Sequence, residues 1–119
     1  MLAGTVLSRE CANTYYSEIL NLVITGLKMK ELEDVFKGVA SLRRINILRT
    51  LFSHKELNVG EIADQIGLSF RSTSKHLIKL EKSGYLRSRQ EGFFRVYWLN
   101  PKPSRTVERV IKLICSYQP

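Results

Sequence analysis

The 119-residue sequence predicts a mainly α-helical domain with one small β-hairpin. Apolar residues recur every three or four positions over most of the chain, which is the pattern of amphipathic helices. Two of these segments are separated only by Leu68 and Ser69 after Gly67, so they form two helices joined by a tight turn. Two runs rich in aromatic and β-branched residues then flank Glu91-Gly92, which is typical of a hairpin. Helices, a helix-turn-helix, a hairpin and a C-terminal helix in this order predict a winged helix-turn-helix fold.

Three helices precede the turn, and we expect them over residues 13–29, 31–38 and 41–54. Asn13 and Ser41 are residue types that cap helix N-termini, so we expect the first and third helices to begin there. The second helix has one apolar face, formed by Leu32, Val35 and Phe36. The third is marked by Leu42, Ile45, Leu48, Leu51 and Phe52.

The helix-turn-helix begins after a turn around residues 56–58. Asn58 can cap a short helix that ends at Ile66, and Gly67 suits the left-handed position that follows a helix. Ser69 then caps the second helix, and Gly84 ends it.

The second of these helices has an inward face and a cationic face. At about 100° per residue, Phe70, Thr73 and Leu80 lie within about 60° of Leu77 and are expected to point into the core. His76 lies to one side and is expected to have a structural role. The opposite side carries Arg71, Ser72, Lys75, Ile78, Lys79 and Lys82, with no acidic residue among them.

The hairpin is predicted from strands over residues 85–91 and 93–99. Its aromatic residues are expected to lie in the core with Val96. For Phe93 and Phe94 beside the turn, the alternative is partial exposure against a sugar edge of DNA. After Asn100-Pro101-Lys102-Pro103, Ser104 is expected to cap a final helix marked by Val107, Val110, Ile111 and Ile114.

Positive charge is concentrated in the second half of the chain. The formal net charge is +8, and residues 69–95 contain seven Lys and Arg but only Glu81 and Glu91. Such a basic block favours an anionic partner, with nucleic acid first and a membrane surface second. A solvated lysine-rich face is the alternative that charge by itself leaves open.

A helix of this size fits the major groove of double-stranded DNA, and its first residues approach the base edges. Arg71 can make bidentate hydrogen bonds to guanine, Ser72 and Lys75 can reach a base or a phosphate, and Lys79 suits the phosphate backbone. The basic hairpin suits a minor groove or phosphates. The candidate DNA-binding residues are Ser69, Arg71, Ser72, Ser74, Lys75, Lys79, Arg87, Arg89 and Arg95.

From about Leu32 to Leu99 the sequence resembles the ArsR-type winged-helix repressors. The segments that carry the resemblance are residues 35–48 (VFKGVASLRRINIL), 62–69 (IADQIGLS), 74–86 (SKHLIKLEKSGYL) and the wing 87–92 (RSRQEG). They occur in order, and the stretch from Leu32 to Leu99 that contains them covers over half of the chain. The resemblance implies a single winged-helix domain over residues 1–119, with a core at 31–100, that regulates transcription as a DNA-binding protein, most simply a repressor.

The resemblance also implies a homodimer on a palindromic operator, in which terminal helices at 1–30 and 103–119 pair. The apolar stripes could equally serve a core within one chain. The candidate dimerisation residues are Tyr16, Ile19, Leu20, Val23, Val107, Val110, Ile111 and Ile114.

Metal-sensing members of that family carry a Cys-x-Cys pair before the turn or Asp and His ligands on the last helix. Here residues 57–62 contain no sulfur and residues 104–116 contain no His or Asp. We therefore expect no metal at these sites, and no cofactor.

Other functions have less support from the residues. No apolar run is long enough to span a membrane and no signal peptide is recognisable, so we expect a cytoplasmic protein. The acidic residues are scattered and no phosphate-binding glycine loop occurs, so we expect no enzyme. Two alternatives remain: a winged helix that binds an acidic protein, and a regulator switched by Cys11 and Cys115 on the helices expected to pair.

Overall fold

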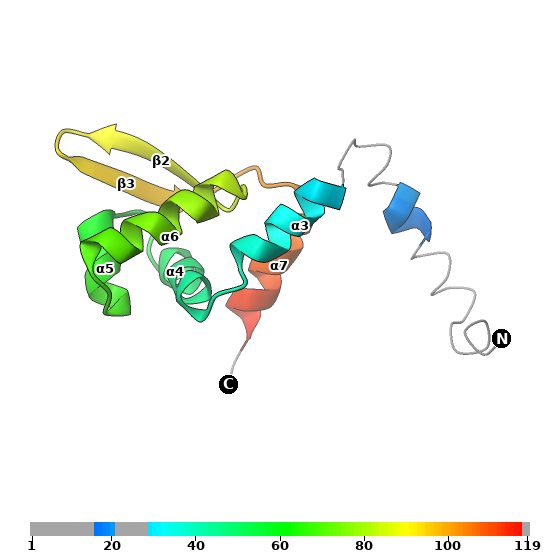
Figure 1. The fold of residues 1–119 in the computed structure, drawn as a ribbon, viewed down its shortest axis with the longest axis horizontal. Helices are drawn as coiled ribbons and strands as arrows, with labels where there is room; N and C mark the ends of the chain where they lie inside the picture. Colours follow the sequence, from blue (N-terminus) through cyan, green and yellow to red (C-terminus); the bar gives the residue numbers. More distant parts are fainter. Residues whose placement is uncertain (1–15, 21–28, 118–119) are drawn as a thin grey trace. The chain divides into compact units, whose positions relative to one another are not determined.

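The computed structural model describes residues 16–20 and 29–117, and it has the predicted mainly helical, winged helix-turn-helix fold (Figure 1). Residues 16–20 are helical, and the remainder of the helix predicted over 13–29 lies outside the described residues, except for Met29. The following elements are α3 (Met29–Gly38), α4 (Leu42–Ser53), β1 (Leu57–Asn58), α5 (Val59–Ile66), α6 (Phe70–Lys82), β2 (Leu86–Glu91), β3 (Phe94–Leu99) and α7 (Arg105–Ser116).

The sequence signals around α5 act as predicted. Asn58 Oδ1 accepts a hydrogen bond from the Glu61 amide at 2.8 Å, and Glu61 Oε1 accepts one from the Asn58 amide at 2.9 Å. This reciprocal pair satisfies two amides that helix geometry leaves without partners. At the other end Gly67 has φ +70°, a left-handed conformation that glycine adopts without steric cost.

Ser69 and Ser104 cap α6 and α7 as expected. The Ser69 hydroxyl accepts from the Ser72 amide at 3.1 Å, and the Ser104 hydroxyl accepts from the Val107 amide at 3.3 Å. Ser41 stands at the predicted start of α4, but its side chain makes no capping hydrogen bond.

The sheet has a third strand that the sequence did not indicate. Residues 56–58 were expected to form only a turn, but β1 pairs antiparallel with β3, placing Leu57 opposite Tyr97 and Asn58 opposite Val96. The strand order is β1-β3-β2, so β3 is central. Two residues are too few to show a strand pattern, and β1 exists because β3 offers it an open edge.

The core lies where α4, α5, α6 and α7 meet the inner end of the sheet. From α6 it receives Thr73, Leu77 and Leu80, as predicted. Ile47 of α4 is also fully buried although it was not among the marker residues. The largest fully buried side chains are Tyr85, Tyr97, Ile47, Leu48, Ile62, Leu77, Leu80, Leu86 and Val107.

Three aromatic residues expected in the core are on the surface. Phe70 is 63% exposed, Phe94 is 60% exposed and Phe93 is 100% exposed. β1 pairs only with residues 96–97 of β3. The outer end of the hairpin therefore extends beyond β1 and beyond the core (Figure 1). Phe70, at the start of α6, faces this uncovered end of the hairpin.

Tyr85 connects α3, α6 and the base of the wing. Its buried hydroxyl donates to the Val35 carbonyl at 2.8 Å. Its amide donates to the Leu80 carbonyl at 3.0 Å, and its carbonyl accepts from the Asn100 amide at 2.9 Å. Burial raises the pKa of Tyr85 to about 12, so the hydroxyl keeps its proton for the bond to Val35.

Arg44 joins the end of α3 to α6. Its Nε and Nη2 atoms donate to the carbonyls of Gly38 at 2.7 Å and Lys37 at 3.1 Å. Its Nη1 atom lies 3.2 Å from His76 Nδ1, which must be unprotonated to accept a hydrogen bond. His76 therefore has the structural role expected from the sequence.

We predict that Gly38→Ala destabilises the fold. A Cβ atom at Gly38 would lie 2.8 Å from Ser83 Cβ and 3.0 Å from the ring of Tyr85, which is fully buried and cannot move away. Overpacking of this kind costs about 1–3 kcal/mol, which exceeds the gain of up to about 1 kcal/mol in helix propensity. The urea midpoint should fall. Gly60→Ala is the matched control, because the nearest atom to its Cβ is 3.4 Å away, and it should be neutral or stabilising. Equal midpoints for Gly38→Ala and the wild type would contradict this packing.

We predict that stability falls as the pH falls below about 6.5. Burial, and then the charges of Arg44, Arg43 and Lys79, lower the pKa of His76 in the folded chain. The unfolded chain therefore binds this proton more readily, and the stabilisation present above pH 6.5 is lost as the pH falls through the folded pKa. Urea midpoints between pH 8 and pH 5 should show a smaller decrease for His76→Gln than for the wild type. Identical curves for His76→Gln and the wild type would refute the assignment.

Candidate nucleic-acid interface

The outer face of α6 carries a stripe of cations. Arg71, Lys75, Lys79 and Lys82 are all exposed, and we call these four residues the α6 stripe. Glu81 points away from it, accepting a hydrogen bond from the Ser88 hydroxyl at 2.8 Å. The stripe can therefore meet an anion without competition from a carboxylate on its own helix.

Two of the serines predicted to contact DNA lie beside the stripe. Ser72 and Ser74 are both half-buried, and Ser74 faces the wing. Ser69 is exposed, and although its oxygen caps α6, its hydroxyl still has a proton to donate. The helix N-terminus also carries partial positive charge. This end of α6 can thus hold a phosphate oxygen.

On the wing, Arg89 is held by other side chains. Its Nη2 atom lies 2.8 Å from Glu56 Oε1, its Nε atom bonds to Glu91, and its guanidinium lies 4.9 Å from the centre of the Trp98 ring. These hydrogen bonds raise the pKa of Arg89 and hold it against the sheet. The sequence does not indicate this, because Glu56 lies 33 positions earlier.

Arg87 and Arg95 are the more accessible wing cations. Both are exposed, and each makes one long side-chain contact of 3.5 Å, Arg87 with Asn100 Oδ1 and Arg95 with Gln90 Oε1. Contacts of this length are weak, so either guanidinium can turn to a phosphate.

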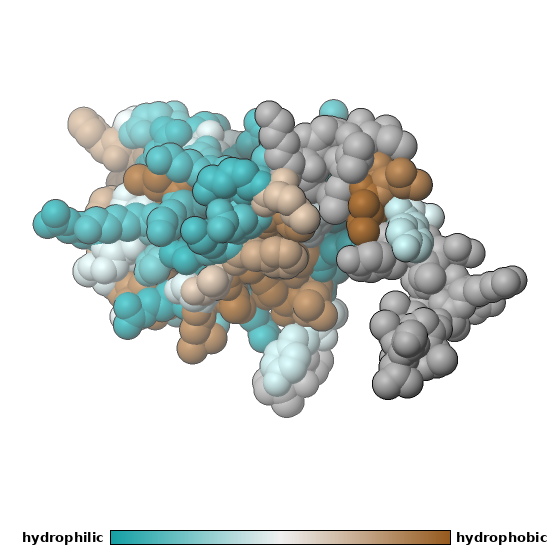
Figure 2. Space-filling view, turned by 45° about the vertical axis from the view of Figure 1, so that its right-hand side comes forward, coloured by the Kyte–Doolittle hydropathy of each residue, from teal (hydrophilic) through white to brown (hydrophobic). Residues whose placement is uncertain are grey.

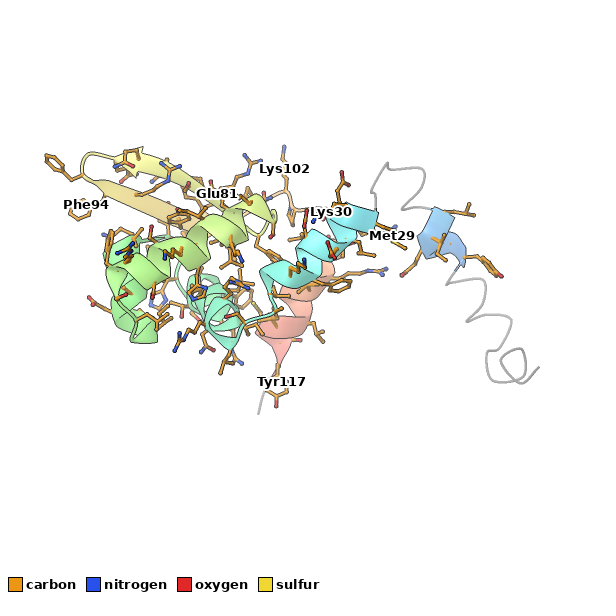
Figure 3. All side chains as sticks on the ribbon, in the orientation of Figure 1. Met29, Lys30, Glu81, Phe94, Lys102 and Tyr117 are labelled. Carbon is orange, nitrogen blue, oxygen red and sulfur yellow. The ribbon has the colours of Figure 1, made fainter. Side chains whose placement is uncertain are left out.

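A hollow of about 400 Å³ separates α6 from the wing. Figure 3 shows two of its lining residues, Glu81 on α6 and Phe94 at the outer end of β3. The residues around it are Val59, Gly60, Phe70, Ser74, Ile78, Glu81, Gln90, Phe93, Phe94, Arg95 and Tyr97. Exposed Ile78 lines the hollow and adjoins the α6 stripe, so the hollow opens beside the cationic face.

The side with α3 and α7 is more apolar, and Figure 2 turns it toward the viewer. The exposed hydrophobic residues of α3, α7 and the start of α4 include Phe36, Leu42 and Leu113, which are 55%, 72% and 73% exposed. We call these three residues the apolar face. Each of these three side chains is more than half exposed to solvent. This side of the molecule can therefore bind an apolar surface on a partner.

The candidate dimerisation residues are distributed unevenly. Val107 is only 2% exposed and belongs to the core of its own chain, and Val110, Ile111 and Ile114 are partly buried against that core. Tyr16, Ile19 and Leu20 are exposed on the helical segment 16–20, and Val23 lies outside the described residues.

Cys115 is a free, half-buried thiol whose pKa is raised mainly by burial, which keeps it protonated at neutral pH. Cys11, the other cysteine of the hypothetical thiol switch, lies outside the described residues. Within residues 16–20 and 29–117, no three His, Cys, Asp or Glu side chains are grouped to hold a metal ion. In the same part of the chain no helix has the length and hydrophobicity needed to cross a bilayer.

Known families and solved structures resemble this chain in sequence and fold. Residues 41–91 match the MarR family, which covers α4 to β2 and less than half of the chain. The solved homodimeric winged helix-turn-helix DNA-binding domain of Mb0332 from Mycobacterium bovis, described as a possible ArsR-family regulator, superposes with a TM-score of 0.62 at 28% identity. That match covers 72% of this chain and 76% of the other.

Three named transcriptional regulators are similar to this chain in sequence. The transcriptional repressor PagR of Bacillus anthracis is 31% identical over 93 residues, covering 76% of this chain and 88% of PagR. The transcriptional activator HlyU of Vibrio cholerae is 34% identical over 80 residues, covering 67% and 70%. KmtR of Mycobacterium tuberculosis, an HTH-type transcriptional regulator, is 35% identical over 66 residues; the match spans 53% of this chain and half of KmtR. These relatives are regulators rather than enzymes. With its winged fold and its cationic α6, the chain belongs to the ArsR family of DNA-binding, winged helix-turn-helix transcriptional regulators.

Proposed function

We propose that this regulator binds a specific double-stranded operator as a homodimer, with α6 in the major groove and the wing on the flanking groove or backbone. The α6 stripe is the observation that carries the proposal: four exposed cations on one helix face, without an acidic neighbour on that face. The 13 residues of α6 span about 20 Å, a length that suits a recognition helix.

The residues of α6 divide into two roles. Arg71, Ser72, Ser74 and Lys75 lie in its first half, where base edges are nearest, and we assign sequence reading to them. Lys79 lies one turn beyond Lys75 and binds the phosphate backbone, as does Ser69 at the N-terminus. On the wing, Arg87 and Arg95 contact phosphates, and Arg89 contributes less because of its bonds to Glu56 and Glu91.

The apolar face supports dimerisation. A homodimer is described for the Mb0332 domain. In this chain, Leu113 of α7 and Phe36 of α3 are exposed, and Tyr16, Ile19 and Leu20 add exposed apolar surface on the segment 16–20. Because Val107 is buried in its own chain, we place Leu113 rather than Val107 at the proposed interface.

Repression is the regulatory outcome that we propose. PagR is a repressor and HlyU an activator, so the family fold serves both. Repression requires only that the dimer occupy its operator, which the proposed binding mode already provides.

We predict that Arg71→Ala and Lys79→Ala have different effects on DNA binding. An operator is first selected from random duplexes with the full-length protein, and binding is then titrated at several salt concentrations. Lys79→Ala should weaken binding to operator and random duplex alike and reduce the salt slope by about 0.9, because one phosphate contact is lost. Arg71→Ala should reduce the preference for the operator by about 1–3 kcal/mol. Lys112→Ala on α7 is the matched control for charge. Failure of the wild type to bind duplex at low salt would refute DNA binding by this surface.

We predict that Leu113→Glu produces monomers. Sedimentation equilibrium should give twice the chain mass of 13.7 kDa for the wild type and the single mass for the variant, because a carboxylate would be buried in the interface. Phe94→Ser, which removes an exposed apolar side chain from the wing, is the control and should remain dimeric. A monomeric wild type, or a dimeric Leu113→Glu, would rule out the proposed interface.

A further inference from the structure

We propose that Phe93 at the tip of the wing is a wedge that inserts between base pairs in the minor groove and bends the operator. This inference rests on the placement of the wing under the proposed function. Its first support is exposure: Phe93 is the most exposed of the large hydrophobic residues described, with a relative exposure of 100%. An aromatic ring in this position has no role in the fold.

The turn holds the wedge firmly. Glu91 is opposite Phe94, so Gly92 and Phe93 form a two-residue loop. Gly92 has φ +61° and Phe93 has a negative φ, which is the pattern of a type II′ turn, whose twist matches that of the strands. Gln90 Nε2 also donates to the Gly92 carbonyl at 3.1 Å. A ring on a short, braced loop loses little conformational entropy when it inserts.

The charges near the tip favour a base contact over a phosphate contact. Arg89 is engaged by Glu56 and Glu91, and the Glu91 carboxylate itself stands next to the turn. The accessible cation here is Arg95, which contacts Gln90. A neutral apolar ring matches the floor of a minor groove, where apolar side chains unstack base steps, while Arg95 beside it binds a flanking phosphate.

The position of the tip relative to α6 is also suitable. Phe93, Phe94 and Arg95 line one side of the hollow, and Phe70 and Ile78 of α6 line the other. The wing therefore faces the side of α6 that carries Ile78, which adjoins the α6 stripe. With α6 in a major groove, the hairpin extends along the duplex toward the adjoining minor groove. β1 holds β3 from the opposite edge, so the hairpin keeps this direction.

The test uses the full-length protein and the selected operator duplex. Fluorophores at the two ends report the bend by energy transfer, and 2-aminopurine placed in turn at each flanking minor-groove step reports unstacking. The wild type should shorten the end-to-end distance and raise the 2-aminopurine emission at one step. Phe93→Ala should abolish both signals and weaken binding roughly tenfold to hundredfold, with an unchanged salt slope. Phe93→Leu should retain part of the bend, because leucine also serves as a wedge.

Phe52→Ala, which removes an exposed phenylalanine from the end of α4, is the matched control and should bend the duplex like the wild type. Equal bending and affinity for Phe93→Ala and the wild type would overturn the wedge while leaving the proposed function intact. A change of mass in Phe93→Ala without DNA would also overturn it, because the tip would then be a protein contact. Absence of wild-type binding to duplex would instead refute the proposed function, and the wedge with it.

Discussion

The orientation of the recognition helix depends on Tyr85. This side chain stands between the end of α6 and the start of β2, and its hydroxyl, amide and carbonyl bond to Val35, Leu80 and Asn100. One residue therefore fixes α3, α6 and the base of the hairpin relative to one another. A buried tyrosine hydroxyl without an acceptor would cost about 1–3 kcal/mol, so the position of α3 and the burial of Tyr85 require each other.

Arg44 and β1 complete this arrangement from two other directions. Arg44 binds the last carbonyls of α3 and contacts His76 on the side of α6 away from the wing. β1 pairs with β3, and its last residue, Asn58, caps α5, so the first helix of the helix-turn-helix is joined to the wing through the sheet. α5, α6 and the hairpin are thus joined by backbone pairing and side-chain contacts, which set the distance between the cationic and aromatic parts of their surface.

Most of the helices, both strands of the hairpin and three caps could be predicted from the sequence, because their signals are local. Asn58, Ser69 and Ser104 act on amides three residues away, and the buried face of α6 follows from helical periodicity. The failures concern long-range contacts. β1 forms on an edge supplied almost 40 residues later, which no local pattern of two residues can reveal.

The candidate site was predictable to a similar degree. The stripe on α6 could be read from a helical wheel, since solvent exposure of a cation follows from its angle. The exposed residues of the wing could not be predicted in this way. Hydrophobicity by itself assigned Phe93 and Phe94 to the core, but the core does not extend to the hairpin tip. Arg89 likewise reads as a free cation until folding brings Glu56 beside it. The sequence shows which side chains are present. Their exposure and their ion pairs depend on which other residues folding brings beside them.

Under the proposed function, the pairing of Arg89 separates the approach to DNA from retention on it. Long-range attraction depends on unpaired charge, and it therefore comes mainly from α6, so association should be the salt-sensitive step. Under the proposed function the wing adds less to that attraction, because Arg89 is paired and only Arg87 and Arg95 are accessible; its main effect is at contact distance, where fit determines how long a complex lasts. Under the proposed function, α6 therefore sets mainly how fast the protein reaches DNA, and the wing how long it stays bound.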